Sequence, residues 1–448
     1  MAALRRIARE RGGWWHAYVC PAHGVELDHG DVLAGVFPEG GARCAYGCRV
    51  DNEAVRGAWL VLSHQAWARH LRVLAHRGER AEAVSRLVEY AGLYEELATA
   101  QHGEAQGWML RGRLFHQALT DAIWAVNIGH AVITLAERGT DDLAGVLPLL
   151  DALERAALDA RDVLTGKGQL ASNYTAWLNA AGVAAGRGAA AARGQEWDGG
   201  KEWLEGEHGL YAHLRVAVAE DGWEWEGSTY YHGFVLRAAL LALRGTDPAA
   251  VPADVVGVLA GMTDVLATIA TPGGILPALH DGPYLRGPLA LEWLELVSLA
   301  QQLVPSAALE AVAGRARAEL GAGDDGLDRE LGGWFAGPAL PARRCRPGRH
   351  PARSRCSPRR ATRCCASRAS TRCWTSVRTA VRTAIGTSCP SISTAIRPPG
   401  SPIPDRCPTP TPSSVICTRR PRRIRRSGWT APSRPSAPGR CSVRTAAR

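Results

Sequence analysis

Residues 60–74 read Leu-Val-Leu-Ser-His-Gln-Ala-Trp-Ala-Arg-His-Leu-Arg-Val-Leu, and this stretch decides the fold class. Leu60, His64, Trp67, Leu71 and Leu74 recur at steps of three and four residues, which places them on one face of a helix. Gly and Pro separate further stripes of this kind, and strand-like alternation is nearly absent. The other stripes cover residues 81–97, 110–135, 143–164, 174–185, 204–218, 230–243, 253–269, 289–303 and 306–320. The sequence therefore predicts an all-α body.

Two helical architectures suit such a chain. Long antiparallel helices joined by short loops build either an α-solenoid or an α/α toroid. The sequence has no strict period of the solenoid kind, which favours the toroid. The predicted fold class is an all-α body that forms an incomplete α/α toroid over residues 52–338.

The net charge of +10 divides unevenly along the chain. Residues 339–448 contain 25 arginines and one acidic residue, Asp405, which gives this segment a formal net charge of +24. The rest of the chain has a formal net charge of −14. Basic segments bind nucleic acid by counterion release, but the acidic body offers no such case. We predict no nucleic-acid partner. Binding through residues 339–448 would require that this segment belongs to the natural protein.

Residues 339–448 also differ in composition. They hold nine of the 12 cysteines and no lysine, are rich in Arg, Pro, Ser and Thr, and show no sustained periodicity. A disordered basic extension is one interpretation. The other, which we favour, is a slipped reading frame, because GC-rich coding DNA read out of frame gives this composition. Reading Cys373-Trp374-Thr375 one nucleotide earlier forces Leu-Asp, and continuing through Cys389 permits the string LDFGPHGGPHRDRDKL.

The start of the chain bears on its compartment. No apolar core of signal-peptide length precedes Gly12. No run of about eighteen apolar residues predicts a membrane span. We expect a cytoplasmic body without a membrane partner.

Residues 1–51 carry a candidate metal site. Cys20 and His23 form a Cys-x2-His pair, and Cys44 and Cys48 form a Cys-x3-Cys pair further along. Three thiolates and one imidazole complete a closed tetrahedral zinc site of the structural type. Buried free cysteines beside a surface histidine are the alternative. Because every cysteine of the body takes part, we predict a small zinc-knuckle region with a stabilising zinc ion.

Three further stretches place polar and aromatic residues where helices are expected to begin. Ser172-Asn173-Tyr174-Thr175-Ala176-Trp177 opens an apolar run, and helix N-capping alone accounts for its first two residues. Residues 220–232, Glu-Asp-Gly-Trp-Glu-Trp-Glu-Gly-Ser-Thr-Tyr-Tyr-His, mix carboxylates with aromatic rings. That mixture suits a carbohydrate cleft, or else a partly buried aromatic loop. Residues 275–282 include the pair His280-Asp281.

In this order and spacing, the three stretches resemble the heparinase II/III-like polysaccharide lyases, including the related alginate lyases. The resemblance covers about residues 105–303. It implies an N-terminal α/α toroid followed by an antiparallel β-sandwich domain with a histidine-bearing segment much like HGHxDKL. The out-of-frame string from the tail is similar to that segment. The β-sandwich is therefore expected to be missing from this chain as written.

The resemblance implies β-elimination next to a uronic acid. Asn173 matches the asparagine that hydrogen-bonds the substrate carboxylate, and Tyr231 matches the tyrosine that acts as Brønsted acid and, with some substrates, as base. Tyr174 stands where many members have a histidine, which leaves the base open. We expect the substrate-binding residues to be Tyr174, Trp177, Glu226, Tyr230, His232 and Asp281.

The predicted function is a polysaccharide lyase-like protein for an acidic polysaccharide or oligosaccharide, inactive or nearly so without the second half of its cleft. An α/α-toroid glycoside hydrolase of uronides is the first alternative, and its carboxylates would come from Asp221, Glu224, Glu226 and Asp281. A non-catalytic carbohydrate-binding or scaffold protein is the second. The glycan, the mode of attack and the oligomeric state stay open.

Overall fold

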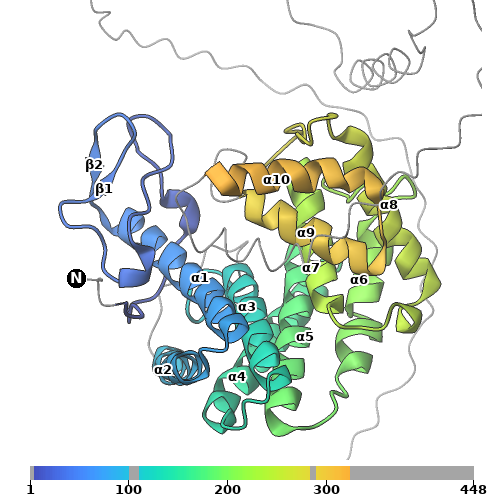
Figure 1. Cartoon of the computed structure of the whole chain (residues 1–448), viewed down its shortest axis with the longest axis horizontal. Helices are drawn as coiled ribbons and strands as arrows, with labels where there is room; N and C mark the ends of the chain where they lie inside the picture. The colour runs from blue at the N-terminus through green and yellow to red at the C-terminus, as the bar shows by residue number, and fades with distance from the viewer. Residues whose placement is uncertain (1–4, 100–109, 283–288, 323–448) are drawn as a thin grey trace, which may run out of the picture. The chain divides into compact units, whose positions relative to one another are not determined.

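The computed structural model describes residues 5–99, 110–282 and 289–322. All of them lie in the first of the two units into which the chain divides, Met1–Arg349. The predicted tail, residues 339–448, lies outside the described residues. The described part is mostly helical (Figure 1), as the hydrophobic stripes predict.

The described helices and strands have the following bounds. The α-helices are α1 Glu53–Arg77, α2 Arg80–Thr99, α3 Ala118–Glu137, α4 Leu147–Thr165, α5 Asn173–Arg193, α6 Leu210–Ala217, α7 Thr229–Leu243, α8 Ala253–Ile269, α9 Leu289–Leu303 and α10 Glu310–Ala322. Short helical turns are η1 Trp15–Ala17, η2 Val32–Ala34, η3 Ala144–Val146, η4 Lys201–Glu205, η5 Pro248–Ala250 and η6 Ala307–Leu309. Two short strands, β1 Ala42–Arg43 and β2 Arg49–Val50, pair antiparallel.

Local chemistry explains both ends of α1. The side chain of Asn52 caps its start by accepting a hydrogen bond from the Val55 amide at 2.9 Å. Gly78 ends it in the left-handed conformation, with φ at 78°. Between these ends, the residues of the predicted stripe from His64 to Leu74 are buried. The helix forms because this stripe packs against the rest of the core.

The helices pack in an alternating order (Figure 1). Each odd-numbered helix packs on the next odd-numbered one, from α1 against α3 through α7 against α9. Each even-numbered helix packs on an odd-numbered neighbour, for example α4 on α5 and α10 on α9. The odd-numbered row supplies the helix ends that border the cleft described below.

Small residues let α3 and α5 approach closely. A Cβ added at Gly129 would lie 2.4 Å from the carbonyl oxygen of Ala184. On another side of α5, Gly182 makes room for η4, because a Cβ added there would lie 2.4 Å from the ring of Trp203. Glycine is therefore required at both positions by the packing rather than by the backbone conformation.

The residues before α1 have a small core of their own. Tyr18, Leu27 and Val50 pack with Trp59 of α1, whose Nε1 donates to the His29 carbonyl oxygen at 2.9 Å. This segment, residues 5–52, contains the predicted metal ligands. Its core is shared with the start of α1, so it is tied to the helical body.

Candidate functional site

A cleft of about 480 Å³ lies where the odd-numbered helices meet the N-terminal segment. The middle of α1 and the starts of α3, α5, α7 and α9 line it, together with Trp14, Trp15, His16 and Glu26. Five of the predicted site residues also line it: Asn173, Tyr174, Tyr230, Tyr231 and Asp281. The fold thus brings together side chains from motifs that are far apart in the sequence.

Four helices begin at this cleft. Gln117 directly precedes α3, Asn173 opens α5, Tyr231 lies in the first turn of α7, and Leu289 opens α9. The first amide groups of a helix have no partner within that helix and carry a partial positive charge. Four such ends favour a bound anion through their dipoles. Arg69 and Arg237 in the lining act in the same direction, whereas the acidic side chains Glu26, Asp281 and Glu292 act against it.

Asn173 is held at the edge of the cleft by its neighbours. The side chain of Ser172 caps α5 by accepting a hydrogen bond from the Tyr174 amide at 3.3 Å. Asn173 Nδ2 donates to Glu226 Oε1 at 2.7 Å. Asn173 Oδ1 is buried and has no hydrogen-bond partner among the described residues. The amide is therefore oriented by Glu226, with one N–H group committed to that carboxyl.

Three tyrosines gather on the side of the cleft formed by α5 and α7. The rings of Tyr230 and Tyr231 meet edge to face, with centroids 5.3 Å apart. Tyr174 donates its hydroxyl to Gln117 Oε1 at 2.8 Å. Burial, and then the nearby Tyr231, raise the pKa of Tyr174 to about 12. Tyr174 is therefore a protonated hydrogen-bonding group at neutral pH.

The loop that carries Asp281 is tied to the start of α7. Ser228 Oγ donates to the Asp281 carbonyl oxygen and accepts a hydrogen bond from the Tyr231 amide at 3.2 Å. The Thr229 amide donates to the Leu279 carbonyl oxygen at 3.3 Å. His280 has φ at 57°, a conformation uncommon for residues other than glycine. The Ser228 cap thus positions Tyr231 and Asp281 together.

Two carboxyl groups stand behind Asn173. Glu224 Oε2 accepts a hydrogen bond from the Glu226 amide at 3.0 Å, and Glu224 is 1% exposed. Burial, and then the charge of Glu226, raise the pKa of Glu224 to about 8. Burial also raises the pKa of Glu226, although the hydrogen bond from Asn173 opposes this shift. Glu226 does not line the cleft; it contacts Asn173, which does.

Trp177 and His232 lie in the core and stay out of the cleft lining. Trp177 is fully buried against Phe234, with ring centroids 4.9 Å apart. His232 is fully buried, accepts a hydrogen bond from the Glu224 amide at 3.2 Å, and donates through Nε2 to the Met262 carbonyl oxygen at 2.8 Å. Burial lowers the pKa of His232 to about 4. Its neutral ring holds the loop before α7, which is a supporting role and not the predicted substrate contact.

Two arginines that the sequence motifs do not single out also line the cleft, Arg69 and Arg237. Arg237 Nε donates to Glu295 Oε2 at 2.7 Å, and Glu295 Oε1 accepts from Arg72 Nη1 at 2.8 Å. Burial disfavours the charged carboxylate of Glu295, but Arg237 and Arg72 outweigh it and lower its pKa to about 2. No local pattern could have found this network, because its partners are 58 and 223 positions apart.

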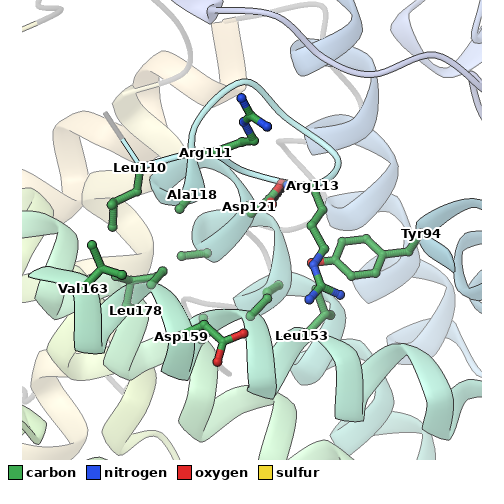
Figure 2. A pocket seen from close by; sticks show the side chains of 16 residues that line it. Tyr94, Leu110, Arg111, Arg113, Ala118, Asp121, Leu153, Asp159, Val163 and Leu178 are labelled. Carbon is green, nitrogen blue, oxygen red and sulfur yellow. Dashed lines mark hydrogen bonds between the residues drawn. The ribbon is translucent and has the colours of Figure 1, made fainter. Parts of the chain in front are cut away.

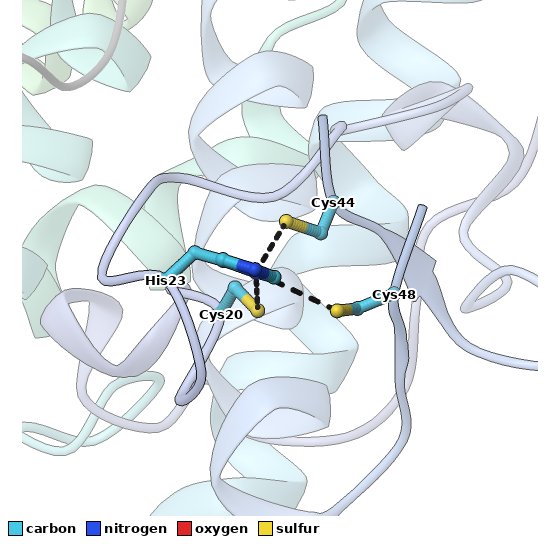
Figure 3. A group of neighbouring side chains, drawn as sticks. All are labelled: Cys20, His23, Cys44 and Cys48. Atoms are coloured by element: carbon cyan, nitrogen blue, oxygen red, sulfur yellow. Dashed lines mark hydrogen bonds between the residues drawn. The ribbon is translucent and has the colours of Figure 1, made fainter. Parts of the chain in front are cut away.

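The predicted metal ligands converge in the N-terminal segment (Figure 3). Cys20, His23, Cys44 and Cys48 each offer a ligand atom, and these atoms all lie within 4.8 Å of one another. His23 Nδ1 lies 3.4 Å from the sulfur of Cys20, 3.6 Å from that of Cys44 and 3.5 Å from that of Cys48. The group could hold a metal ion, as the spacing of the two ligand pairs predicts.

Backbone hydrogen bonds close the turn that carries each ligand pair. The Cys20 amide donates to the Val25 carbonyl oxygen at 2.8 Å, and the Cys44 amide donates to the Cys48 carbonyl oxygen at 2.8 Å. Burial tends to raise the pKa of Cys20, but hydrogen bonds from His23 and backbone amides outweigh it, so that its pKa falls to about 6. The thiolate is the form that binds metal.

A second pocket, of about 290 Å³, opens between α3, α4 and α5 (Figure 2). Its lining is mostly alanine, leucine and valine, and Arg113 extends over the ring of Tyr94 at 5.7 Å. Burial raises the pKa of Asp121 to about 7, and that carboxyl accepts hydrogen bonds from the amides of Arg113 and Phe115. The Asp121 carboxyl is thus engaged in holding the preceding loop.

Among the described helices, α3 is long and apolar enough to cross a membrane, with a mean hydropathy of 1.3. Within its apolar window, 83% of the residues are buried inside the fold. α3 packs against α1 and α5. Its apolar character is accounted for by this packing.

No family model matches this chain, and no curated protein matches it significantly. The site therefore rests on its own geometry. That geometry consists of a cleft bordered by helix N-termini, tyrosines and Asn173, and of a separate Cys/His group able to hold a metal ion.

Proposed function

We propose that the cleft binds a uronate-containing glycan and that the chain is a polysaccharide lyase-like protein of the β-elimination class. One observation carries this proposal. Asn173 and Tyr231, chosen from separate motifs, line one cleft that is bordered by four helix N-termini. An anionic sugar carboxylate fits such a place, because the helix ends favour negative charge.

The proposed chemistry assigns a task to each group. Asn173 donates to the uronate carboxylate and so stabilises the negative charge that develops when the C5 proton leaves. Tyr231 gives a proton to the leaving glycosidic oxygen. Tyr174, with its raised pKa and its hydrogen bond to Gln117, orients the sugar. The C5 proton is removed either by Tyr231 itself, which then starts as the phenolate and passes this proton on to the leaving oxygen, or by a base outside the described residues, in which case Tyr231 starts protonated.

The wider architecture is also part of the proposal. An α/α toroid is supported by the alternating packing, in which odd-numbered helices follow one another and even-numbered helices pack on them. We attribute residues 339–448 to a slipped reading frame that removed the β-sandwich domain. Sequencing the DNA around the codons for residues 340–349 tests this, and a confirmed frame there would overturn it. With half of the cleft missing, turnover by the chain as written is expected to be slow or absent.

Product analysis tests the lyase assignment. The chain and a frame-restored version are incubated with heparan, chondroitin, alginate and hyaluronate, and unsaturated uronate ends are followed by ultraviolet absorbance. Activity only in the frame-restored protein is the expected result. Glycan binding without any product in that protein would instead support a non-catalytic carbohydrate-binding protein.

A hydrolase is the second candidate, and one observation favours it. Glu224 has a pKa of about 8, which would keep it protonated as a general acid requires, and Glu226 stands next to it. Its burial at 1% exposure argues for a supporting role. Tyr231→Phe separates the two reactions, because it should abolish elimination and spare hydrolysis.

We also propose that the metal of the Cys20, His23, Cys44 and Cys48 group is zinc in a structural role. Zinc bonds of about 2.3 Å to sulfur and 2.0–2.1 Å to nitrogen place tetrahedral ligands about 3.6 Å apart. The three distances from His23 Nδ1, from 3.4 to 3.6 Å, agree with this value. Metal analysis of the chain and of Cys44→Ser tests the proposal, and equal zinc in both would contradict it.

A further inference from the structure

The N-terminal segment forms part of the cleft wall as well as carrying the metal ligands. Trp14, Trp15, His16 and Glu26 line the cleft together with residues of α1. η1, which contains Trp15 and His16, packs against α1. The segment that could hold a metal ion therefore also faces the proposed glycan.

The aromatic residues of this wall lie together. The His16 ring centroid is 4.0 Å from that of Trp15 and 5.3 Å from that of Trp14. Trp14 is 41% exposed, which is unusual for so large an apolar side chain. A pyranose ring presents a face of C–H groups, and such a face packs on an aromatic ring while the sugar hydroxyls stay in water. The wall thus has the chemistry of a sugar-binding platform.

The position of this wall is coupled to the metal ligands through the backbone. Val19 pairs with Glu26 in an isolated antiparallel bridge, and the turn between them contains both Cys20 and His23. Leu27, next to Glu26, pairs in the same way with Cys44. Small metal-binding segments of this kind take their fold from the bound metal. The Leu27 amide donates to the Tyr18 carbonyl oxygen at 3.4 Å, and the Tyr18 amide donates to the Trp15 carbonyl oxygen at 3.1 Å, which links the same hairpin to η1. Loss of the metal should therefore release Glu26 and the η1 residues from the cleft.

We propose that Trp14, Trp15 and His16 form a sugar-stacking subsite, and that metal in the Cys20, His23, Cys44 and Cys48 group holds this subsite in place. The proposal rests on the proposed function, because it assigns a further contact to the same uronate-containing glycan. The metal would then affect how tightly the glycan binds, and it would take no part in the elimination reaction.

Calorimetric titration of the whole chain tests the subsite. The probes are tetrasaccharides of heparan, chondroitin, alginate and hyaluronate, and the tightest of them is then titrated into each variant. Trp14→Ala should weaken binding about five- to tenfold, because it removes the ring face on which the sugar packs. Trp14→Phe keeps a ring and should bind within about threefold of the unaltered chain. Val36→Ala removes an exposed apolar side chain of the same segment outside the cleft lining and should change nothing.

A second set of measurements tests the role of the metal. Cys48→Ser should lose bound zinc and bind the tetrasaccharide about tenfold more weakly. Cys407→Ser, the same chemical change in the tail, should keep zinc and affinity. Chelation followed by zinc addition on the unaltered chain should remove and restore binding, with hydrogen exchange of residues 14–27 rising and falling in step. Because chelation and zinc addition use the unaltered chain, this measurement stays informative even if the Cys48→Ser variant misfolds.

The outcomes separate the two proposals. If no tetrasaccharide binds to the unaltered chain, the proposed function fails and the subsite fails with it. If the unaltered chain binds but Trp14→Ala binds equally well, the function stands and the subsite is wrong. If Cys48→Ser and the chelated chain lose zinc yet keep full affinity, the coupling between metal and cleft is wrong.

Discussion

Asn173 Nδ2 donates a 2.7 Å hydrogen bond to Glu226 Oε1 and thereby joins the first residue of α5 to the loop that leads into α7. These two residues come from different sequence motifs and are 53 positions apart. The bond fixes the orientation of an amide at the edge of a cleft bordered by positive helix ends. It makes Asn173 the residue whose removal should affect anion binding most specifically.

Asn173→Ala should weaken binding of a uronate tetrasaccharide about tenfold or more, because a hydrogen bond to a charged group contributes about 1.5–3 kcal/mol. Isothermal titration calorimetry measures the effect. Gln169→Ala, an exposed amide just before α5 and outside the cleft lining, is the control and should leave affinity unchanged. Equal affinity in Asn173→Ala would remove this residue from the binding site.

The raised pKa of Glu224 should make the free energy of unfolding depend on pH. Its pKa is raised from 4.5 to about 8 in the folded chain, so the folded state holds a proton that the unfolded chain releases in this window. The free energy of unfolding should therefore fall as the pH rises from about 4.5 to about 8, by at most about 1.4 kcal/mol per pH unit from this group. Glu224→Gln cannot ionise and should flatten that decline.

Urea unfolding at about pH 5 and pH 8, followed by tryptophan fluorescence, gives the comparison. Glu220→Gln alters an exposed carboxylate of the same loop and should keep the pH dependence of the unaltered chain. A decline of the same slope in Glu224→Gln would show that Glu224 does not hold the proton.

Glu295→Gln should destabilise the fold by about 3–5 kcal/mol, because it leaves Arg72 and Arg237 buried without their shared carboxylate. Glu319→Gln breaks the exposed pair with Arg315 and should cost less than about 1 kcal/mol. Both values come from urea unfolding at neutral pH. Similar losses in the two variants would mean that the buried network contributes no more than a surface pair.

Much of the helical fold could be predicted from the sequence, because apolar stripes specify which face of a helix is buried. The predicted segments 253–269 and 289–303 coincide with α8 and α9. The prediction of helix over 110–117 was wrong: Asp121 accepts the amides of Arg113 and Phe115 and holds this stretch as a loop before α3. The segment 204–218 is likewise interrupted, since α6 begins only at Leu210.

Part of the candidate site could likewise be predicted from the sequence, and part could not. The spacing of Cys20, His23, Cys44 and Cys48 was enough to predict a group able to hold a metal ion, because ligand pairs on turns are a local signal. Trp14–His16 and Arg237 were missed as cleft residues, since only the tertiary fold brings them to Asn173. His232 was expected at the substrate, but its ring is occupied by two backbone groups in the core.

The most direct measurement is the ultraviolet absorbance of unsaturated uronate released by the frame-restored protein and by its Tyr231→Phe variant. We expect release from at least one of heparan, chondroitin, alginate and hyaluronate, and a loss of about 100-fold or more in the variant, because it lacks the general acid. Cleavage without unsaturated ends, or undiminished elimination by Tyr231→Phe, would contradict it.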